Sequence, residues 1–207
     1  VKGYRFLGPL YSVKQTLRKS RALRSWIAAH GLLVRGINTP LPLAALENRR
    51  GPFVREAFFI SRWLPDAREL NSYVQHTELG VRKNAFLQAL ARTLQTMHSR
   101  GIYHADLKSN NILVTDREPD GWAFWFVDLD RVSFQKTISF SQRANNLAQI
   151  NASVAAVMTI RDRLKFFHFY AKGTEFFPMR KKYYKKIMAI SRTKNTEPYG
   201  IRFSRTD

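Results

Sequence analysis

Cysteine is absent from the 207-residue sequence, which excludes disulfide bonds and thiolate chemistry and fits a reducing cytoplasm. Long apolar runs are absent too, since no stretch reaches the roughly eighteen consecutive apolar residues of a membrane-spanning helix. No secretory signal is visible at the start of the sequence. These absences predict a protein that works in the cytoplasm without spanning a membrane.

Acidic residues are scarce: 15 Asp and Glu stand against 35 Lys and Arg, which gives a formal net charge of +20. Such a surface attracts polyanions, namely nucleic acid, anionic lipid headgroups or phosphorylated saccharides, and the charge alone does not choose among them. Apolar and aromatic contents of 44% and 13% are typical of a folded protein. Because the sequence starts at Val1 in what reads as the middle of a strand, we expect further N-terminal sequence to precede it.

The pattern along the chain predicts strands and one helix first, and then mostly helices with an embedded hairpin. The first helix is expected over residues 20–36, with an apolar face made of Leu23, Trp26, Ile27, Leu33 and Val34. Other expected elements are strands at 1–4, 56–64, 111–115 and 123–127, an extended segment at 37–46, a turn at 48–51 and a short helix at 67–74.

A long helix is expected over residues 81–100, because apolar residues recur there at offsets of three and four: Leu87, Leu90, Leu94 and Met97. From Asn145 onward the pattern is helical again, over residues 150–173 and 179–191. Both segments are apolar on one side and basic on the other. The chain is long enough for one globular unit divided into two unequal lobes.

The stretch "HADLKSNNILV" places three polar side chains at fixed offsets on a loop between the long helix and a short strand: Asp106, Lys108 and Asn111. Phosphoryl transfer needs a carboxylate that takes the acceptor's proton, a cation near the phosphate and oxygen ligands for Mg²⁺. Asp106 suits the first role, Lys108 the second and Asn111 part of the third. The loop therefore predicts a site of phosphoryl transfer.

A second metal-binding carboxylate has to come from another strand, and Asp128 in "FWFVDLDRV" is placed to supply it. The strands at 111–115 and 123–127, joined by the "EPDG" turn, form an expected hairpin. This hairpin would bring Asp128 back beside Asn111. The buried strand would then deliver a carboxylate to the metal.

"HADLKSNN" resembles the protein-kinase catalytic loop H-R-D-L-x-x-x-N at every fixed position except the arginine, which is Ala105 here. "VDLD" stands where kinases carry D-F-G. The second aspartate and the arginine in "DLDRV", and the helix followed by "GINTPLP", resemble the bacterial lipopolysaccharide core kinases (the Kdo/WaaP family). The resemblance covers most of the chain, from Val1 to about Lys172.

The resemblance implies an α+β, two-lobed protein-kinase-like fold. Residues 1–64 would form a small N-terminal sheet lobe that is truncated, and residues 65–207 a larger helical lobe with the catalytic loop and the basic C-terminal helices. The implied activity is ATP- and Mg²⁺-dependent phosphorylation of a sugar hydroxyl, on Kdo or heptose, in the lipopolysaccharide inner core. The implied location is the cytoplasmic face of the inner membrane.

The resemblance also implies roles for single residues: Asp106 would be the catalytic base, and Asn111 and Asp128 the metal ligands. Lys2 resembles the strand lysine that contacts the nucleotide phosphates. The hinge whose backbone receives adenine would be formed by Ser61, Arg62, Trp63 and Leu64.

The sequence departs from the kinase pattern at two places. No Gly-rich phosphate loop precedes Lys2 in this sequence. The first helix carries Ser25 where a glutamate that pairs with the strand lysine is expected, and Glu47 lies too far outside the helix to replace it. Another carboxylate would have to hold Lys2, or the enzyme would be weak.

Several other side chains can be interpreted in two ways. His104 is expected to brace the loop by hydrogen bonds rather than to act as a base. Asp130 would either approach a second metal or pair with Arg131. Aromatic residues of the basic helices are expected to pack on the large lobe: Phe166, Phe167 and Phe169. Four lysines there would face either water or an anionic membrane surface: Lys181, Lys182, Lys185 and Lys186.

Three functions compete on this sequence. A lipopolysaccharide core kinase leads, and a phosphotransferase for a protein or another small molecule is second, although no A-P-E sequence follows Asp128. The third is a pseudokinase or basic membrane adaptor without turnover, which intact Asp106, Asn111 and Asp128 oppose. No motif for specific nucleic-acid binding accompanies the basic residues, and the sequence does not indicate an oligomeric state.

Overall fold

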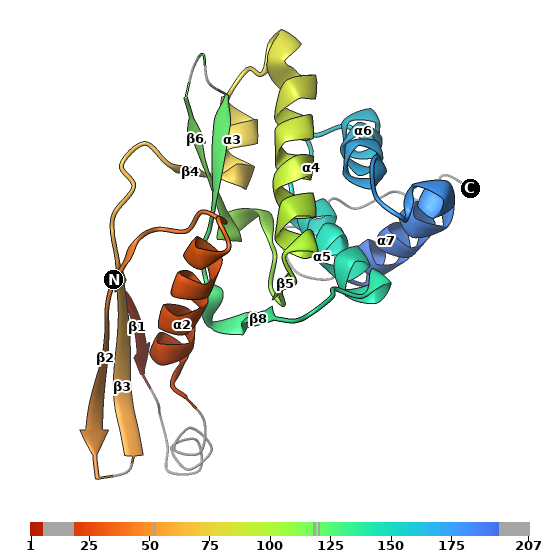
Figure 1. The fold of residues 1–207 in the computed structure, drawn as a ribbon. Coiled ribbons are helices and arrows are strands. Elements are labelled where there is room, and N and C mark those ends of the chain that lie inside the picture. The colour runs from red at the N-terminus through yellow and green to blue at the C-terminus, as the bar shows by residue number, and fades with distance from the viewer. Residues whose placement is uncertain (6–18, 52, 118, 120, 195–207) are drawn as a thin grey trace.

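The computed structural model describes residues 1–5, 19–51, 53–117, 119 and 121–194. A sheet of three antiparallel strands stands at one end of the molecule and a group of helices at the other (Figure 1). The sheet has the order β1-β3-β2, formed by β1 (Lys2–Arg5), β3 (Phe53–Ser61) and β2 (Pro42–Arg50). Strand β2 continues through Arg50, which pairs with Phe53, so the turn expected over residues 48–51 is shorter than predicted.

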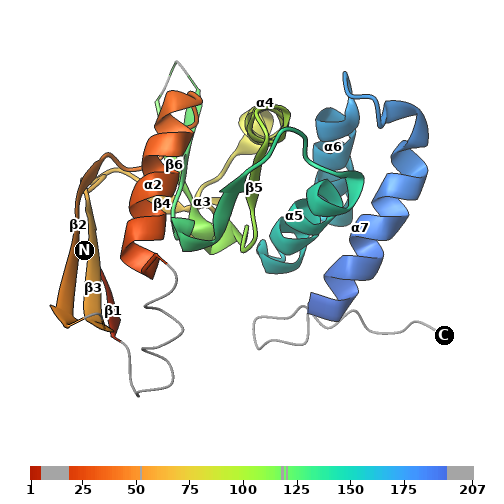
Figure 2. The same ribbon diagram turned by 60° about the horizontal axis from the view of Figure 1, so that its bottom comes forward.

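Helix α2 (Arg21–Val34) lies between this sheet and the rest of the molecule (Figures 1 and 2). It starts at Ser20, whose side chain accepts a hydrogen bond from the Leu23 N–H. The apolar face predicted for this helix is wrong, because Ile27 and Val34 are exposed. Its buried residues are mostly small: Ala22, Ser25, Ala28, Ala29 and Leu32. Small side chains let the helix backbone come close to its neighbours, and the larger apolar residues fall on the other sides.

Two small sheets connect the halves of the molecule. One has the order β4-β6-β7 and the other pairs β5 with β8. Their bounds are Arg68–Glu69 for β4, Ile102–His104 for β5, Ile112–Asp116 for β6, Trp122–Phe126 for β7 and Val132–Phe134 for β8. The predicted hairpin is confirmed as β6 and β7, which pair antiparallel with Ile112 opposite Phe126. Short 3₁₀ turns flank the sheets: η1 (Gly80–Arg82), η2 (Ser109–Asn111) and η3 (Leu129–Arg131).

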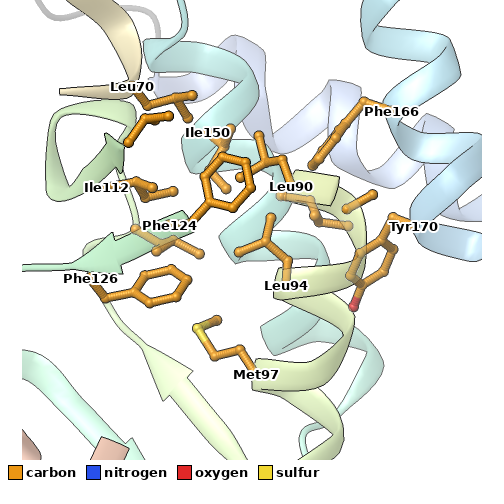
Figure 3. Packing of buried hydrophobic residues seen from close by; sticks show 14 of the residues in the cluster. Leu70, Leu90, Leu94, Met97, Ile112, Phe124, Phe126, Ile150, Phe166 and Tyr170 are labelled. Atoms are coloured by element: carbon orange, nitrogen blue, oxygen red, sulfur yellow. The ribbon is translucent and has the colours of Figure 1, made fainter. Parts of the chain in front are cut away.

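The helical half contains α3 (Leu70–His76), α4 (Lys83–Ser99), α5 (Phe140–Ser153), α6 (Ile160–Ala171) and α7 (Arg180–Lys194), with η4 (Phe177–Met179) before the last. The predicted long helix is confirmed as α4, and its apolar residues are buried in the main core together with side chains of the hairpin and of α5 and α6 (Figure 3). The segment predicted as one helix over 150–173 is split, because Thr159 and Asp162 form a capping box that starts α6 anew. No helix among the described residues has the length and apolarity needed to cross a membrane.

Candidate active site

His104, at the end of β5, holds the loop that carries Asp106. Its Nδ1 accepts a hydrogen bond from the Asp106 N–H at 3.2 Å, and its Nε2 lies 3.0 Å from the Val127 carbonyl oxygen. Burial lowers the pKa of this imidazole, and its hydrogen bond to Val127 and the neighbouring carboxylates act against that shift. A neutral His104 satisfies both contacts, so the predicted bracing role is confirmed.

Helix α5 anchors the same loop through two buried amides that the sequence analysis missed. Gln149 accepts a hydrogen bond from the Leu107 N–H at 3.0 Å and donates one to the Ala105 carbonyl at 2.7 Å. Asn146 donates to the His104 carbonyl at 2.6 Å. Both amides lie about forty residues away in the sequence, where the only signal was the presence of polar residues, Asn146, Gln149 and Asn151, on the buried side of the helix.

Asp106 and Lys108 lie next to each other at the open side of this loop. The Lys108 Nζ is 3.8 Å from Asp106 Oδ1, and the two side chains are 50% and 27% exposed. Asn111 donates from Nδ2 to the Asp106 carbonyl at 2.8 Å, which leaves its Oδ1 as the remaining acceptor of that amide. The loop therefore offers a carboxylate and an ammonium group to an incoming acceptor.

The hairpin brings Asp128 back to Asn111, as predicted. Val127 donates its N–H to the Asn111 carbonyl at 3.0 Å, which places the residue after Val127 next to the catalytic loop. Asp128 has a φ of 57° and is the one non-glycine residue with positive φ among the described residues. Such a backbone conformation costs energy and is common at functional sites.

Lys2 of β1 pairs directly with the Asp128 carboxylate. Burial acts to raise the pKa of Asp128, but the hydrogen bond and charge of Lys2 outweigh it, so this pKa is lowered. The carboxylate that holds Lys2 is thus Asp128. Ser25 instead faces the Tyr4 hydroxyl at 3.4 Å, and Glu47 forms an ion pair with Arg49 at 2.6 Å on the exposed hairpin.

Asp130 does not pair with Arg131, which was one of its two predicted readings, and its approach to a second metal stays a prediction. Its carboxylate is buried and accepts a hydrogen bond from Arg21 Nε at 2.6 Å, with Arg24 Nη2 at 3.8 Å from the same oxygen. Its ion pairs are therefore with α2 rather than with Arg131 on its own turn. The Arg131 pairing was wrong because η3 packs against α2, so the nearest cations come from that helix.

A cleft of about 420 Å³ lies between the three-stranded sheet and the hairpin. Its lining includes Lys2, Asp128 and the predicted hinge residues Ser61, Arg62 and Trp63. Apolar side chains from both sides, among them Phe59, Leu64 and Leu113, complete the walls. At the hinge, Arg62 donates its N–H to the Leu41 carbonyl at 2.8 Å, so this donor is already occupied. The cleft combines apolar walls for a planar ring with a cation and a carboxylate at one end.

The donor set fits Mg²⁺ better than a metal held by a full protein cage. Asp128 offers a carboxylate and Asn111 an amide oxygen, on segments joined by the hydrogen bond from Val127 to the Asn111 carbonyl. Among the described residues no group of three or more His, Cys, Asp and Glu could hold a metal ion. Mg²⁺ commonly uses one or two protein oxygens together with substrate phosphates and water, so these residues fit a magnesium nucleotide.

The C-terminal helices divide as the sequence suggested. Phe166 and Phe167 are buried, and Phe169 packs partly buried against the core, so the packing interpretation is confirmed for all three. Lys186 donates to the Ser141 hydroxyl at 2.8 Å and lies over the Phe140 ring. The other three lysines of the predicted set, Lys181, Lys182 and Lys185, are exposed on α7.

Residues 10–170 match the sequence family described as "Lipopolysaccharide kinase (Kdo/WaaP) family". Among curated proteins, the 3-deoxy-D-manno-octulosonic acid kinase of Vibrio cholerae serotype O1 is 28% identical over 135 residues, which is 65% of this chain and 53% of that protein. The enzyme of the same description from Photobacterium profundum is 29% identical over equal shares. The chain thus spans about half the length of the curated relatives it matches.

Among solved structures, "WaaP in complex with acyl carrier protein" has a TM-score of 0.65 and 22% identity, over 83% of this chain and 76% of that one. At this identity the likeness shows the fold. The predicted α+β, protein-kinase-like architecture is confirmed.

Proposed function

Because the chain belongs to the lipopolysaccharide kinase (Kdo/WaaP) family, we propose that it phosphorylates a sugar hydroxyl of the lipopolysaccharide inner core at the expense of ATP. The observation that carries this proposal is the meeting of Asp106, Lys108 and Asn111 on one loop with Asp128 on the adjoining hairpin. Residues 1–64 and 65–207 would be the two lobes that enclose the nucleotide. The ion pair of Lys2 with Asp128 disfavours the alternative of an adaptor without turnover. It gives the strand lysine the carboxylate partner that the sequence lacks at Ser25.

Each residue has one task in the proposed reaction. Asp106 orients the acceptor hydroxyl and takes its proton on the carboxylate, and Lys108 offsets negative charge beside it. Lys2 contacts the nucleotide phosphates, and the backbone of Ser61, Arg62 and Trp63 holds the adenine ring, apart from the Arg62 N–H that bonds Leu41. Asn111 and Asp128 would hold Mg²⁺, which would neutralise charge on the phosphates of ATP, the donor of the γ-phosphoryl group.

Kdo is the acceptor we favour over heptose. The relatives from Vibrio cholerae and Photobacterium profundum are described as 3-deoxy-D-manno-octulosonic acid kinases. Kdo carries a carboxylate, and a chain with a net charge of +20 suits an anionic acceptor.

The test is transfer of labelled γ-phosphate from Mg-ATP by the full-length protein to two matched inner-core acceptors, one ending in Kdo and one in heptose. We expect label on the Kdo acceptor, at a rate well above that on heptose. Label on heptose alone would reverse the choice of sugar. ATP binding without label on either acceptor would contradict the proposed function.

We further propose that the protein works at the cytoplasmic face of the inner membrane, attached peripherally through the exposed lysines of α7. Each basic residue near an anionic bilayer contributes about 1 kcal/mol of binding free energy. The double variant Lys181→Gln, Lys182→Gln should therefore sediment less with vesicles that contain anionic phospholipid.

The matched control for this test is the double variant Lys83→Gln, Lys165→Gln. It removes the same charge from a different face, where Lys83 pairs with Asp162 and Lys165 donates to Asn84. Equal loss of vesicle binding in both double variants would show attraction by net charge without a role for α7.

A further inference from the structure

Helix α2 faces η3 with two arginines. Arg21 Nε donates to Asp130 Oδ2 at 2.6 Å, and Arg24 Nη2 lies 3.8 Å from the same oxygen. The Asp130 side chain is only 3% exposed, so water and salt screen these contacts weakly. Because Asp130 lies two residues after Asp128, the contacts tie α2 to the turn that carries the proposed metal ligand.

The same helix also contacts the strand that carries Lys2. The Arg21 guanidinium lies 4.8 Å from the centre of the Tyr4 ring, and Ser25 Oγ lies 3.4 Å from the Tyr4 hydroxyl. Lys2 Nζ lies 5.6 Å from the centre of that ring. Helix α2 thus contacts the neighbours of both residues of the Lys2–Asp128 ion pair. It reaches Tyr4 beside Lys2 and Asp130 beside Asp128.

Two atoms of the arginine cluster have no hydrogen-bond partner among the described residues. Arg24 Nε and Asp130 Oδ1 are both buried and unpaired. Both atoms belong to side chains that already lie close to each other, since Arg24 Nη2 is 3.8 Å from Asp130 Oδ2.

Arg21 also interacts electrostatically with the Asp128 carboxylate. The hydrogen bond with Asp130 raises the pKa of Arg21, burial opposes this, and the charges of Asp130, Tyr4 and Asp128 add to the rise. The cluster contains three cations, Lys2, Arg21 and Arg24, against the carboxylates of Asp128 and Asp130.

We propose that Arg21 and Arg24 clamp Asp130 and thereby position both Asp128 and Lys2, in the place of the lysine–glutamate ion pair that Ser25 cannot form. The two arginines and Asp130 act as positioning residues, with no contact to substrate. The inference rests on the proposed function, because it assigns Asp128 to the metal.

A double-mutant cycle tests the clamp in the full-length protein, using Arg21→Gln, Asp130→Asn and the two combined. Loss of a partner that orients a metal ligand typically costs 10- to 100-fold in metal affinity or activity. We expect Asp130→Asn to lower kcat, and to raise the Mg²⁺ concentration that half-saturates ATP binding in calorimetry, each by about that factor. The KM for the sugar should stay near its parental value. The double variant should be no worse than Asp130→Asn, because Asp130→Asn already disrupts the contact that Arg21→Gln removes.

The matched control is Arg49→Gln. It removes an arginine–carboxylate pair with the same 2.6 Å separation, on strand β2 of the three-stranded sheet, where the Arg49 side chain is 50% exposed. This variant should keep the parental kcat and Mg²⁺ requirement.

Parental values in folded Asp130→Asn would overturn the clamp, and so would losses that multiply in the double variant. If Asp130→Asn fails to fold, Arg21→Gln decides the question, because its side chain is 40% exposed and its loss leaves the core intact. An unchanged Mg²⁺ requirement in Arg21→Gln then overturns the proposal. A parent that binds Mg-ATP without transferring phosphate would refute the proposed function, while the Mg²⁺ requirement for binding would still test the clamp.

Discussion

The loop that carries Asp106 and the turn that carries Asp128 are held in place by different kinds of contact. The backbone of the Asp106 loop is held by neutral, buried partners, namely the imidazole of His104 and the amides of Asn146 and Gln149, while the Asp106 carboxylate itself has Lys108 at 3.8 Å. Around Asp128 the partners are charged and partly exposed, as in the ion pair with Lys2, whose side chain is 43% exposed.

This difference fits a division of labour across the site. Neutral hydrogen bonds inside a protein are hardly screened and fix one geometry, which suits a base that has to meet an acceptor hydroxyl. Ion pairs at the edge of a cleft can exchange partners when another charged group arrives. In the proposed reaction Lys2 would therefore leave Asp128 for a phosphate, whereas Asp106 would keep its position.

The largest expected effect comes from the base itself. Asp106→Asn should lower kcat about 10²- to 10⁴-fold, the usual contribution of general base catalysis, and leave the KM for ATP nearly unchanged. The measurement is steady-state transfer of γ-phosphate to the core acceptor.

A carboxylate with a structural role serves as the control for that variant. Asp116 lies at the far end of the hairpin and accepts hydrogen bonds from Tyr73 at 2.7 Å and Arg82 at 2.9 Å. Asp116→Asn should reduce stability and keep transfer. Normal transfer in Asp106→Asn would remove the loop from the chemistry.

Low pH should weaken the neutral hydrogen bonds that support the Asp106 loop, through protonation of His98. His98 links α4 to Asn146 and Tyr170, and burial lowers its pKa to about 4, with a smaller opposing effect of the Asn146 hydrogen bond. In the unfolded chain His98 is protonated below its ordinary pKa of 6.5. The contribution of neutral His98 to the free energy of unfolding is therefore complete above pH 6.5 and is lost as the pH falls toward about 4. The loss over that window amounts to about 3 kcal/mol of unfolding free energy.

Urea unfolding at a series of pH values measures this loss in the parent and in His98→Gln. The variant should show a flatter dependence between pH 6.5 and about 4. The same slope in both proteins would mean that His98 is not the titrating group.

Removing one amide anchor should have an effect on stability of similar size. Gln149→Leu leaves the Leu107 N–H and the Ala105 carbonyl unpaired, at a cost of about 1–3 kcal/mol for each buried group. Because these groups flank Asp106, kcat should fall as well.

Gln95→Leu provides the comparison for that variant, since Gln95 also bonds backbone carbonyls, at Tyr170 and Lys172, but far from the loop. It should lose stability without losing transfer beyond the folded fraction. Equal kcat in folded Gln149→Leu and Gln95→Leu would show that Gln149 does not position Asp106.

The smallest effect is expected on an ion pair outside the cleft. Arg49→Gln breaks the pair with Glu47 and should change the unfolding free energy by less than about 1 kcal/mol, as exposed pairs do. Urea unfolding at low and high salt measures the change. A larger value would mean that charged contacts of this sheet hold the fold as firmly as the neutral ones.

The sequence was sufficient where the interacting residues are close along the chain. Asp106 and Asn111 belong to one short loop, and the hairpin that returns Asp128 to Asn111 is also local. The pairing register of such a hairpin follows from its turn and its alternation of apolar residues.

The sequence failed where contacts depend on distant packing. The ion pair of Lys2 with Asp128 joins residues 126 positions apart, and that of Arg21 with Asp130 spans 109. The buried face of α2 was missed because it is lined by alanine and serine, which carry a weaker periodic signal than the exposed Ile27 and Val34.

Calorimetric binding of Mg-ATP to the parent, Asp106→Asn and Asp128→Asn tests the proposed division of labour most directly. The account predicts that Asp106→Asn binds Mg-ATP as the parent does while transfer is lost. Asp128→Asn should lose the dependence of ATP binding on Mg²⁺. Equal loss of Mg²⁺-dependent binding in both variants, or in neither, would contradict the assignment of catalysis to the loop and of the nucleotide to the cleft.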